Sequence, residues 1–196
     1  MARDRREEHH PDQLSSSRKP SRDPIMSAHE TTGTGSEDRS SGLPFRPGLL
    51  VLFSGLSLLT LAAGGWLTSL GLGPWYDALR IPWFQPPSWV FTPAWTLIFI
   101  LLAFSTWRIA RRGAPARITL VVYWIQLVLN MLWSLFFFTM QRPDLALAEI
   151  LVLDVVVVAM VVMYGRLDRT AGWLLIPYPI WLMLATAINL WIVLNN

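Results

Sequence analysis

Amide and indole side chains occur at helical spacing inside an apolar run of this sequence. Gln126, Asn130 and Trp133 are spaced i, i+4 and i+7, so a helix places all three on one face. Inside a membrane-spanning helix, such amides are costly unless they face the bundle interior or a cavity. These residues therefore either join neighbouring helices, at about 0.6 kcal/mol per hydrogen bond, or bind a ligand.

A comparable stripe lies near the end of the chain, at Trp181, Ala185 and Asn189. The spacing again places the three side chains on one helical face. Because Ala185 is small, either a helix or a ligand can approach closely at that point.

Two acids, Glu149 and Asp154, lie within a further apolar run. Intramembrane acids are candidates for function, although they are costly to bury. We expect Glu149, near the end of its run, to reach the membrane interface, and Asp154 to lie deeper. The helical repeat turns the two side chains about 140° apart, so they do not form one carboxylate pair. Asp154 is either protonated or hydrogen-bonded to a neighbouring helix, or it belongs to a proton relay.

The residue types that usually hold metals and haem are missing from the apolar part of the chain. There is no cysteine, which excludes disulfides and thiolate chemistry, and the three histidines are His9, His10 and His29. We therefore expect no metal site and no tightly bound cofactor.

Five apolar runs position these side chains. Their approximate limits are 48–70, 91–110, 118–138, 145–164 and 171–194. Each is close to the roughly 20 residues that a helix needs to cross a bilayer. The composition agrees, since 53% of the chain is hydrophobic and 15% is charged. The sequence predicts an all-α membrane protein, a bundle of five transmembrane helices in which only the first loop, 71–90, is long.

The first 47 residues have a different composition. They hold eight of the sixteen basic residues and eight of the thirteen acidic ones, with few apolar side chains. Such a segment buries too little surface to offset its ordering entropy, so we expect a disordered polar tail over 1–47 and the membrane domain over 48–196. The alternative interpretation of the tail is a regulatory or docking arm.

The basic residues predict the orientation. Fourteen of them lie in the tail or in the second and fourth connections, whereas Arg80 and Arg142 lie on the other side. The positive-inside rule then places the N-terminus inside and the C-terminus outside in a multi-pass protein. Arginines that flank apolar runs fit this topology better than a nucleic-acid partner.

The first loop carries the stretch PWYDALRIPWFQPPSWVFTPAW, residues 74–95, with four tryptophans and five prolines. Trp and Tyr are typical of the membrane–water interface. Interfacial preference does not explain Pro82, Pro86, Pro87 and Pro93, which fix φ and keep the preceding residue out of the helical region. We expect a stiff, extended aromatic lid, suited to a flat apolar ligand.

This loop resembles the first-loop signature of the TspO/MBR family, the tryptophan-rich sensory proteins and translocator proteins. Two later blocks are similar to the family's third and fifth helices, QLVLNMLWSLFFF at 126–138 and IPYPIWLMLATAINL at 176–190. The matching loop residues are Trp75, Tyr76, Leu79, Pro82, Pro86, Pro87, Val90, Phe91 and Trp95.

The resemblance implies binding of tetrapyrroles such as protoporphyrin IX, with porphyrin transport or stress regulation downstream. It places Trp95 and Asn130 around the ligand. The alternatives are light-driven porphyrin breakdown by Trp95 and Trp181, and a lipid or sterol carrier or scaffold. A homodimer is a possible assembly. The candidate ligand-binding residues are Trp75, Arg80, Trp83, Pro86, Pro87, Trp95, Phe99, Gln126, Asn130, Trp133, Trp181, Ala185 and Asn189.

Overall fold

The computed structural model describes residues 46–196, so residues 1–45 of the predicted tail lie outside the described residues. The described part contains helices and no strand. Five helical segments are long and apolar enough to cross a membrane, which confirms the predicted fold class. They are Pro47–Gly71 (α1), Ser88–Ala110 (α3), Ala114–Thr139 (which includes α4, Arg117–Ser134), Pro143–Leu167 (α5) and Arg169–Asn195 (α6 and α7).

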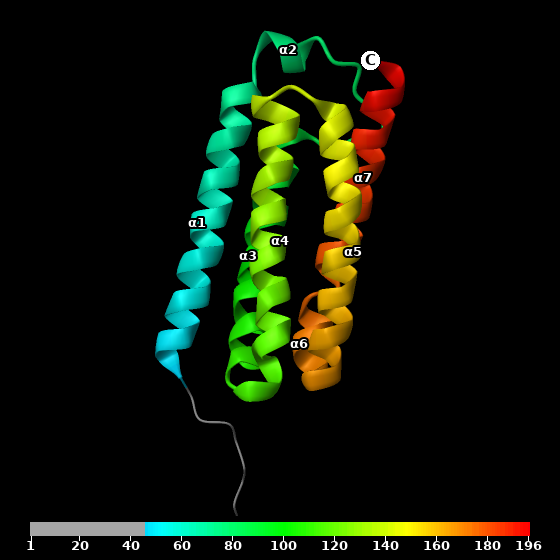
Figure 1. Ribbon diagram of the computed structural model, residues 1–196. Coiled ribbons are helices and arrows are strands. Elements are labelled where there is room, and N and C mark those ends of the chain that lie inside the picture. The colour runs from blue at the N-terminus through cyan, green and yellow to red at the C-terminus, as the bar shows by residue number, and fades with distance from the viewer. Residues whose placement is uncertain (1–45) are drawn as a thin grey trace, which may run out of the picture. The chain divides into compact units, whose positions relative to one another are not determined.

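The helices alternate in direction, as is usual for helices joined by short connections. Helix α1 packs against α3 and α4, α4 packs against α5, and α5 packs against α6 and α7. One end of the bundle holds the start of α1, the α3–α4 connection and α6; we call it the α6 end (Figure 1). The other end, the α2 end, holds the short helix α2 (Pro74–Asp77), the α4–α5 turn and the C-terminus (Figure 1).

Prolines set several helix boundaries. Pro47, Pro74, Pro143 and Pro177 each lie at the start of a helix, where the missing N–H costs nothing. Pro93 was predicted to stiffen the loop, but it lies inside α3, which already begins at Ser88. Because Pro93 is within two turns of the helix start, it removes one N–H without ending the helix.

The fifth span was predicted as one continuous helix, and it is divided. Helix α6 covers Arg169–Leu174 and α7 covers Pro177–Asn195. Between them the chain tightens into i to i−3 hydrogen bonds, such as that from the Tyr178 N–H to the Leu175 carbonyl at 3.0 Å. Pro177 and Pro179 cannot donate the bonds that a continuous α-helix would need here.

The end of α4 changes to a π-helix, Leu135–Thr139. Its wider turn brings the Phe138 backbone against Gly71 so closely that a Cβ on Gly71 would collide with the Phe138 carbonyl group. It also presents Phe137 to Trp75, with ring centroids 6.0 Å apart. A π-helical turn is rare and widens the helix locally, so this short segment fixes how the first loop sits on the bundle.

The first loop is pinned across the α2 end. The Arg80 N–H donates to Asn196 Oδ1 at 2.8 Å, and Asn196 Nδ2 donates to the Arg80 carbonyl at 3.1 Å. Pro82 is buried, and Gln85 Nε2 donates to the Tyr76 hydroxyl at 3.3 Å. The predicted lid is therefore partly helical, through α2, and is tied to the C-terminus.

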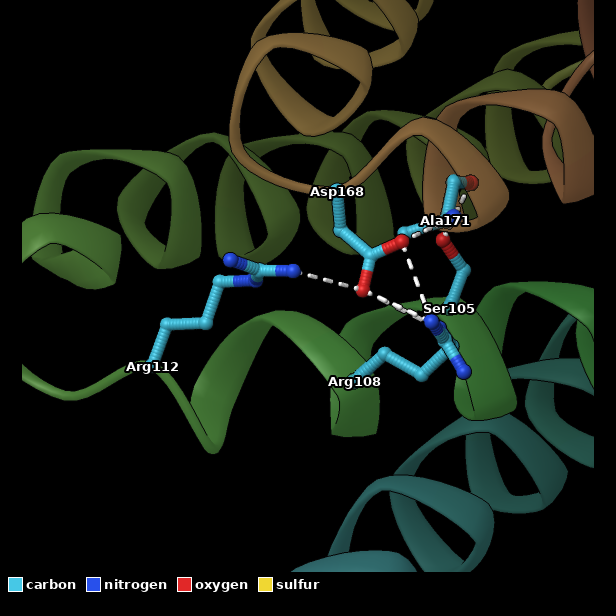
Figure 2. Close-up of polar contacts among 5 residues, drawn as sticks. All are labelled: Ser105, Arg108, Arg112, Asp168 and Ala171. Atoms are coloured by element: carbon cyan, nitrogen blue, oxygen red, sulfur yellow. Dashed lines mark hydrogen bonds and ion pairs between the residues drawn. The ribbon is translucent and has the colours of Figure 1, made fainter. Parts of the chain in front are cut away.

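The α6 end is held by a carboxylate between two arginines, which Figure 2 shows. Arg108 Nη2 and Arg112 Nη2 donate to Asp168 Oδ2 at 2.9 and 3.1 Å. Asp168 also caps α6 by accepting from the Ala171 N–H at 3.1 Å, while Ser105 donates to the Ala171 carbonyl at 2.7 Å. We call Ser105, Arg108, Arg112, Asp168 and Ala171 the Asp168 cluster.

Electrostatics favour the ionised form of Asp168. Burial opposes its ionisation, but the hydrogen bonds from Arg112, the Ala171 N–H and Arg108 outweigh burial and hold its pKa below the ordinary value for aspartate. The cluster joins the end of α3 to the start of α6, two segments about sixty residues apart in sequence.

Candidate functional site

Tyr178 of α7 lies at the centre of the bundle and is 1% exposed. Its hydroxyl donates to Gln126 Oε1 at 2.9 Å and accepts from Asn130 Nδ2 at 3.2 Å. This one hydroxyl therefore links Gln126 and Asn130 of α4 to α7. These bonds are the interhelical contacts that the sequence offered as one interpretation of Gln126 and Asn130.

Three aromatic rings meet beside this hydroxyl. The Trp95 ring centroid is 6.1 Å from that of Tyr178 and 6.5 Å from that of Trp181, both close to edge-on. Phe99, which is buried, lies one turn from Trp95 with its ring 6.0 Å away, and Phe91 packs on Trp181 at 5.5 Å. Edge-to-face packing of this kind forms an apolar wall with defined ring orientations.

Glu149 faces the interior, not the membrane interface as predicted. It is 8% exposed, and neither of its carboxyl oxygens hydrogen-bonds to a described residue. The cause is its place on the buried face of α5, in register with Ala146, Ile150 and Leu153.

Asp154 is half-buried on the edge of the same face. Its Oδ2 accepts a hydrogen bond from the Thr186 hydroxyl of α7 at 2.8 Å, while Oδ1 is buried without a partner in the described part. This bond to a neighbouring helix is one of the interpretations that the sequence left open for Asp154.

We call these residues together the Tyr178 cluster: Trp95, Gln126, Asn130, Glu149, Asp154, Tyr178 and Trp181. Five of its buried polar atoms have no partner among residues 46–196: Gln126 Nε2, both Glu149 oxygens, Asp154 Oδ1 and Trp181 Nε1. Leaving a buried donor or acceptor unpaired costs about 1–3 kcal/mol. The cluster thus offers both donors and acceptors to whatever enters the bundle interior.

Nearer the α2 end, the remaining polar residues of the two stripes are paired with each other. Trp133 Nε1 donates to Asn189 Oδ1 at 3.2 Å, and Asn189 Nδ2 donates to the Pro143 carbonyl at 2.8 Å. Trp133 also stacks on Phe137 at 5.3 Å, and Phe137 contacts Trp75. Trp75, Trp133 and Asn189 thus form a layer between the first loop and the Tyr178 cluster.

Other candidate residues lie elsewhere. Trp83 is 92% exposed and points away from the bundle interior. Arg80 is exposed beside the C-terminus, Pro86 is half-buried in the loop, and Pro87 precedes the first residue of α3. Ala185 is buried in the core on α7. The candidate residues on the long helices therefore lie together inside the bundle. The candidate residues of the first loop lie at the α2 end, and Trp83 points away from the bundle interior.

Tyr178 was missed as a candidate, although its signal was present in the sequence. It lies three residues before Trp181, on the same helical face as the predicted stripe. Thr186, the partner of Asp154, also lies in the block 176–190 that resembles the family's fifth helix, but it was not named as a candidate. Among the residues that the structure describes, no three His, Cys, Asp or Glu side chains gather in a way that could hold a metal ion.

Comparison with known proteins assigns the family. The sequence model of the TspO/MBR family matches residues 53–194, which span all five membrane segments. The chain belongs to the TspO/MBR family. It is a multi-pass integral membrane protein, and the resemblance seen in the first loop, residues 126–138 and residues 176–190 is confirmed.

Several members of this family are similar in sequence to the chain. The chain is 40% identical over 115 residues to the tryptophan-rich sensory protein of Cereibacter sphaeroides, covering 59% of this chain and 72% of that protein. It is 36% identical over 136 residues to the tryptophan-rich protein TspO of Archaeoglobus fulgidus, covering 68% and 88%. It is 31% identical over 134 residues to the translocator protein of Sus scrofa, covering 64% and 79%.

Proposed function

We propose that the bundle interior between α3, α4 and α7 binds a flat tetrapyrrole such as protoporphyrin IX, and that this binding serves porphyrin transport or stress regulation. The observation that carries the proposal is the composition of the Tyr178 cluster. Its rings form an apolar wall, and its unpartnered donors and acceptors lie beside that wall. Pockets for drug-sized ligands combine these two features.

In this proposal the chain holds the ligand by stacking and hydrogen bonding. Trp95 and Trp181 pack against the ring faces, while Trp181 Nε1 and Gln126 Nε2 donate to acceptors on the ligand. Because Trp95 packs edge-on against both Tyr178 and Trp181, the ligand enters only when these rings separate. Arg80, exposed at the α2 end, pairs with a propionate that projects from the bundle.

A titration of the purified full chain in detergent with protoporphyrin IX, followed by absorbance difference spectra in the dark, tests the proposal. We expect saturable binding that Asn130→Leu weakens by about 1–3 kcal/mol, if a ligand hydrogen bond depends on this amide. Trp124→Phe is the matched control, since Trp124 lies on α4 but is 48% exposed outside the cluster. Absence of saturable binding would overturn the proposal and leave a carrier or scaffold role.

A second candidate function is light-driven breakdown of the bound porphyrin. The contact between the Trp95 and Trp181 indoles, 6.5 Å between centroids, favours it, because two oxidisable rings border the same site. Trp95→Phe and Trp181→Phe keep an aromatic face, so binding should persist while porphyrin absorbance decays more slowly under illumination. Equal decay in the wild type, both variants and protein-free detergent would exclude this chemistry.

For the orientation, we propose that the α6 end faces the inside. The distribution of arginines supports this orientation, because Arg80 and Arg142 belong to the α2 end and seven others belong to the α6 end. These seven are Arg46, Arg108, Arg111, Arg112, Arg117, Arg166 and Arg169. The cysteine-free chain allows single-cysteine labelling. Ser88→Cys should react from outside, and Ala114→Cys only after permeabilisation. Labelling of Ala114→Cys in intact cells would reverse the orientation.

A further inference from the structure

A hollow of about 210 Å³ opens on the flank of the bundle near the α6 end. It is lined by Val161 and Gly165 of α5, by Arg169, Gly172 and Trp173 of α6, and by Ile176. It is separate from the Tyr178 cluster, with which it shares no residue. Apolar side chains and two glycines form most of its wall, and one arginine supplies its charge.

Two glycines create this hollow. A Cβ added at Gly172 would lie 2.6 Å from the Gly165 Cα and 3.3 Å from the Val161 carbonyl oxygen, so α5 and α6 meet backbone to backbone. Because neither glycine has a side chain, the surface above the contact is indented. Val161, Ile176 and Trp173 then form the sides of a groove with a smooth floor.

The residues around the hollow place it at the level where a membrane helix meets water. Arg166 and Arg169 are exposed on either side of the α5–α6 connection. Trp173 is 71% exposed, and tryptophan is enriched at the headgroup level of a bilayer. An apolar groove with an arginine at its polar end therefore faces the lipid at this depth.

Arg169 has no acidic partner among residues 46–196. Among the described residues, Asp168 is the acid at this end, and Arg108, Arg112 and the Ala171 N–H already occupy its carboxylate. No ion pair joins Arg169 to any residue of the described part. The described residues of this end include seven arginines and one aspartate, so their formal charges leave an excess of positive charge.

We propose that the hollow is a site for an anionic phospholipid. The lipid phosphate pairs with Arg169, and one acyl chain lies over the Gly165–Gly172 floor between Val161 and Ile176. A free phosphate ion would leave the apolar wall unused, which is why the proposal commits to a lipid. The excess of arginine at this end favours an anionic headgroup over a zwitterionic one.

Native mass spectrometry of the purified full chain in detergent, with added palmitoyl-oleoyl phosphatidylglycerol or phosphatidylcholine, tests this site. We expect the wild type to retain phosphatidylglycerol in preference to phosphatidylcholine. Arg169→Gln should reduce retained phosphatidylglycerol about fivefold, the effect expected when one basic residue loses its contact with an anionic lipid. Arg117→Gln is the matched control, because Arg117 is exposed at the same end but does not line the hollow.

A second variant tests the groove itself. A Cβ on Gly165 would meet only the Gly172 Cα, at 3.9 Å, so Gly165→Ala is compatible with the helix contact and narrows the hollow. It should lower phosphatidylglycerol retention with Arg169 intact and with an unchanged melting temperature. Equal retention of the two lipids, equal loss in Arg117→Gln and Arg169→Gln, no effect of Gly165→Ala, or displacement by excess inorganic phosphate would each overturn the proposal.

Discussion

The Asp168 cluster and the Tyr178 cluster both contain buried carboxyl groups, but these groups differ in the hydrogen bonds that they accept. Asp168 is 6% exposed and accepts hydrogen bonds from two arginines and a backbone N–H. Glu149 is 8% exposed and accepts none from the described residues. Asp168 and Glu149 are therefore almost equally buried, but only Asp168 has hydrogen-bond partners among the described residues.

This difference favours a structural role for the Asp168 cluster and agrees with the binding role that we propose for the Tyr178 cluster. A buried carboxylate with charged partners and a cap contributes to the fold, and its removal leaves the partners uncompensated. A buried carboxyl group without partners lowers stability, so it is kept for another reason. We infer that the Asp168 cluster holds the helices together, and that the Tyr178 cluster is where the bundle retains unmet polar groups for a ligand.

The largest effect that this comparison predicts is on stability at the α6 end. Asp168→Ala removes the α6 cap and leaves Arg108 and Arg112 unpaired, so we expect a loss of about 3 kcal/mol, since caps contribute about 1 kcal/mol and charged hydrogen bonds about 1.5–3 kcal/mol. Equilibrium unfolding in mixed detergent micelles measures this loss. The two arginines are partly exposed, which keeps the loss below that of a fully buried pair.

Asp144→Ala is the control for that substitution. Asp144 pairs with Arg142 at 2.6 Å, but both side chains are more than half exposed. Exposed pairs contribute about 0–1 kcal/mol, so this variant should be close to the wild type. If the two variants lost the same stability, the Asp168 cluster would not have the role that we assign to it.

The second prediction concerns Glu149 and has the opposite sign. Glu149→Leu removes two unpartnered oxygens and no hydrogen bond to a described residue, so the free energy of unfolding should rise by about 1–2 kcal/mol. The same unfolding experiment measures it. A loss of stability comparable to that of Asp168→Ala would mean that Glu149 has strong partners, and the contrast between the clusters would fail.

The third prediction concerns the central hydroxyl. Tyr178→Phe removes the bonds to Gln126 and Asn130 but keeps the ring that packs on Trp95. Two interhelical bonds at about 0.6 kcal/mol each predict a loss of about 1 kcal/mol. Thr186→Val, which removes the single bond to Asp154, should lose about half as much. No loss in either variant would show that these bonds contribute nothing to the bundle.

The five helices could be predicted because each apolar run is long enough to cross a bilayer and the connections after the second helix are short. The break between α6 and α7 was missed, although Pro177 and Pro179 were visible, because hydropathy does not change across it. The π-helix at Leu135–Thr139 has no simple sequence signal, since its four apolar residues and one threonine fit either type of helix.

The interior position of Glu149 could not be predicted from periodicity. Helix α5 is apolar nearly all round, and lipid and protein interior both favour apolar side chains, so the pattern does not reveal which face points inward. The pairing of Asp168 with two arginines could not be predicted either, because these arginines lie on α3 or directly after it, about sixty residues earlier in the sequence. By contrast, Gln126 and Asn130 were identified correctly as interior candidates because they are polar residues at helical spacing.

The smallest predicted effect is on the pH dependence of the Asp168 cluster. The pKa of Asp168 is lower in the folded protein than its ordinary value, so the folded state binds the proton more weakly than the unfolded state does. The stability from Asp168 is therefore present in full above about pH 4–5, the region just above the pKa of an unfolded aspartate. It is lost as pH falls through the folded pKa.

Melting temperatures of the wild type and Asp168→Asn, measured side by side from pH 6 to pH 3, test this linkage. Asp168→Asn keeps the size of the side chain and lacks the charge, so the wild type should melt higher at pH 6. As pH falls below about 4, the wild-type carboxylate begins to protonate and the difference should narrow. Other acids, such as Asp144, titrate in both proteins and cancel in the difference.

The change in stability should be smaller than that in Asp168→Ala, because a protonated carboxyl group still accepts hydrogen bonds and protonation is incomplete at pH 3. A difference that stays constant from pH 6 to pH 3 would mean that the charge of Asp168 does not stabilise the fold, and that capping of α6 alone accounts for the cluster.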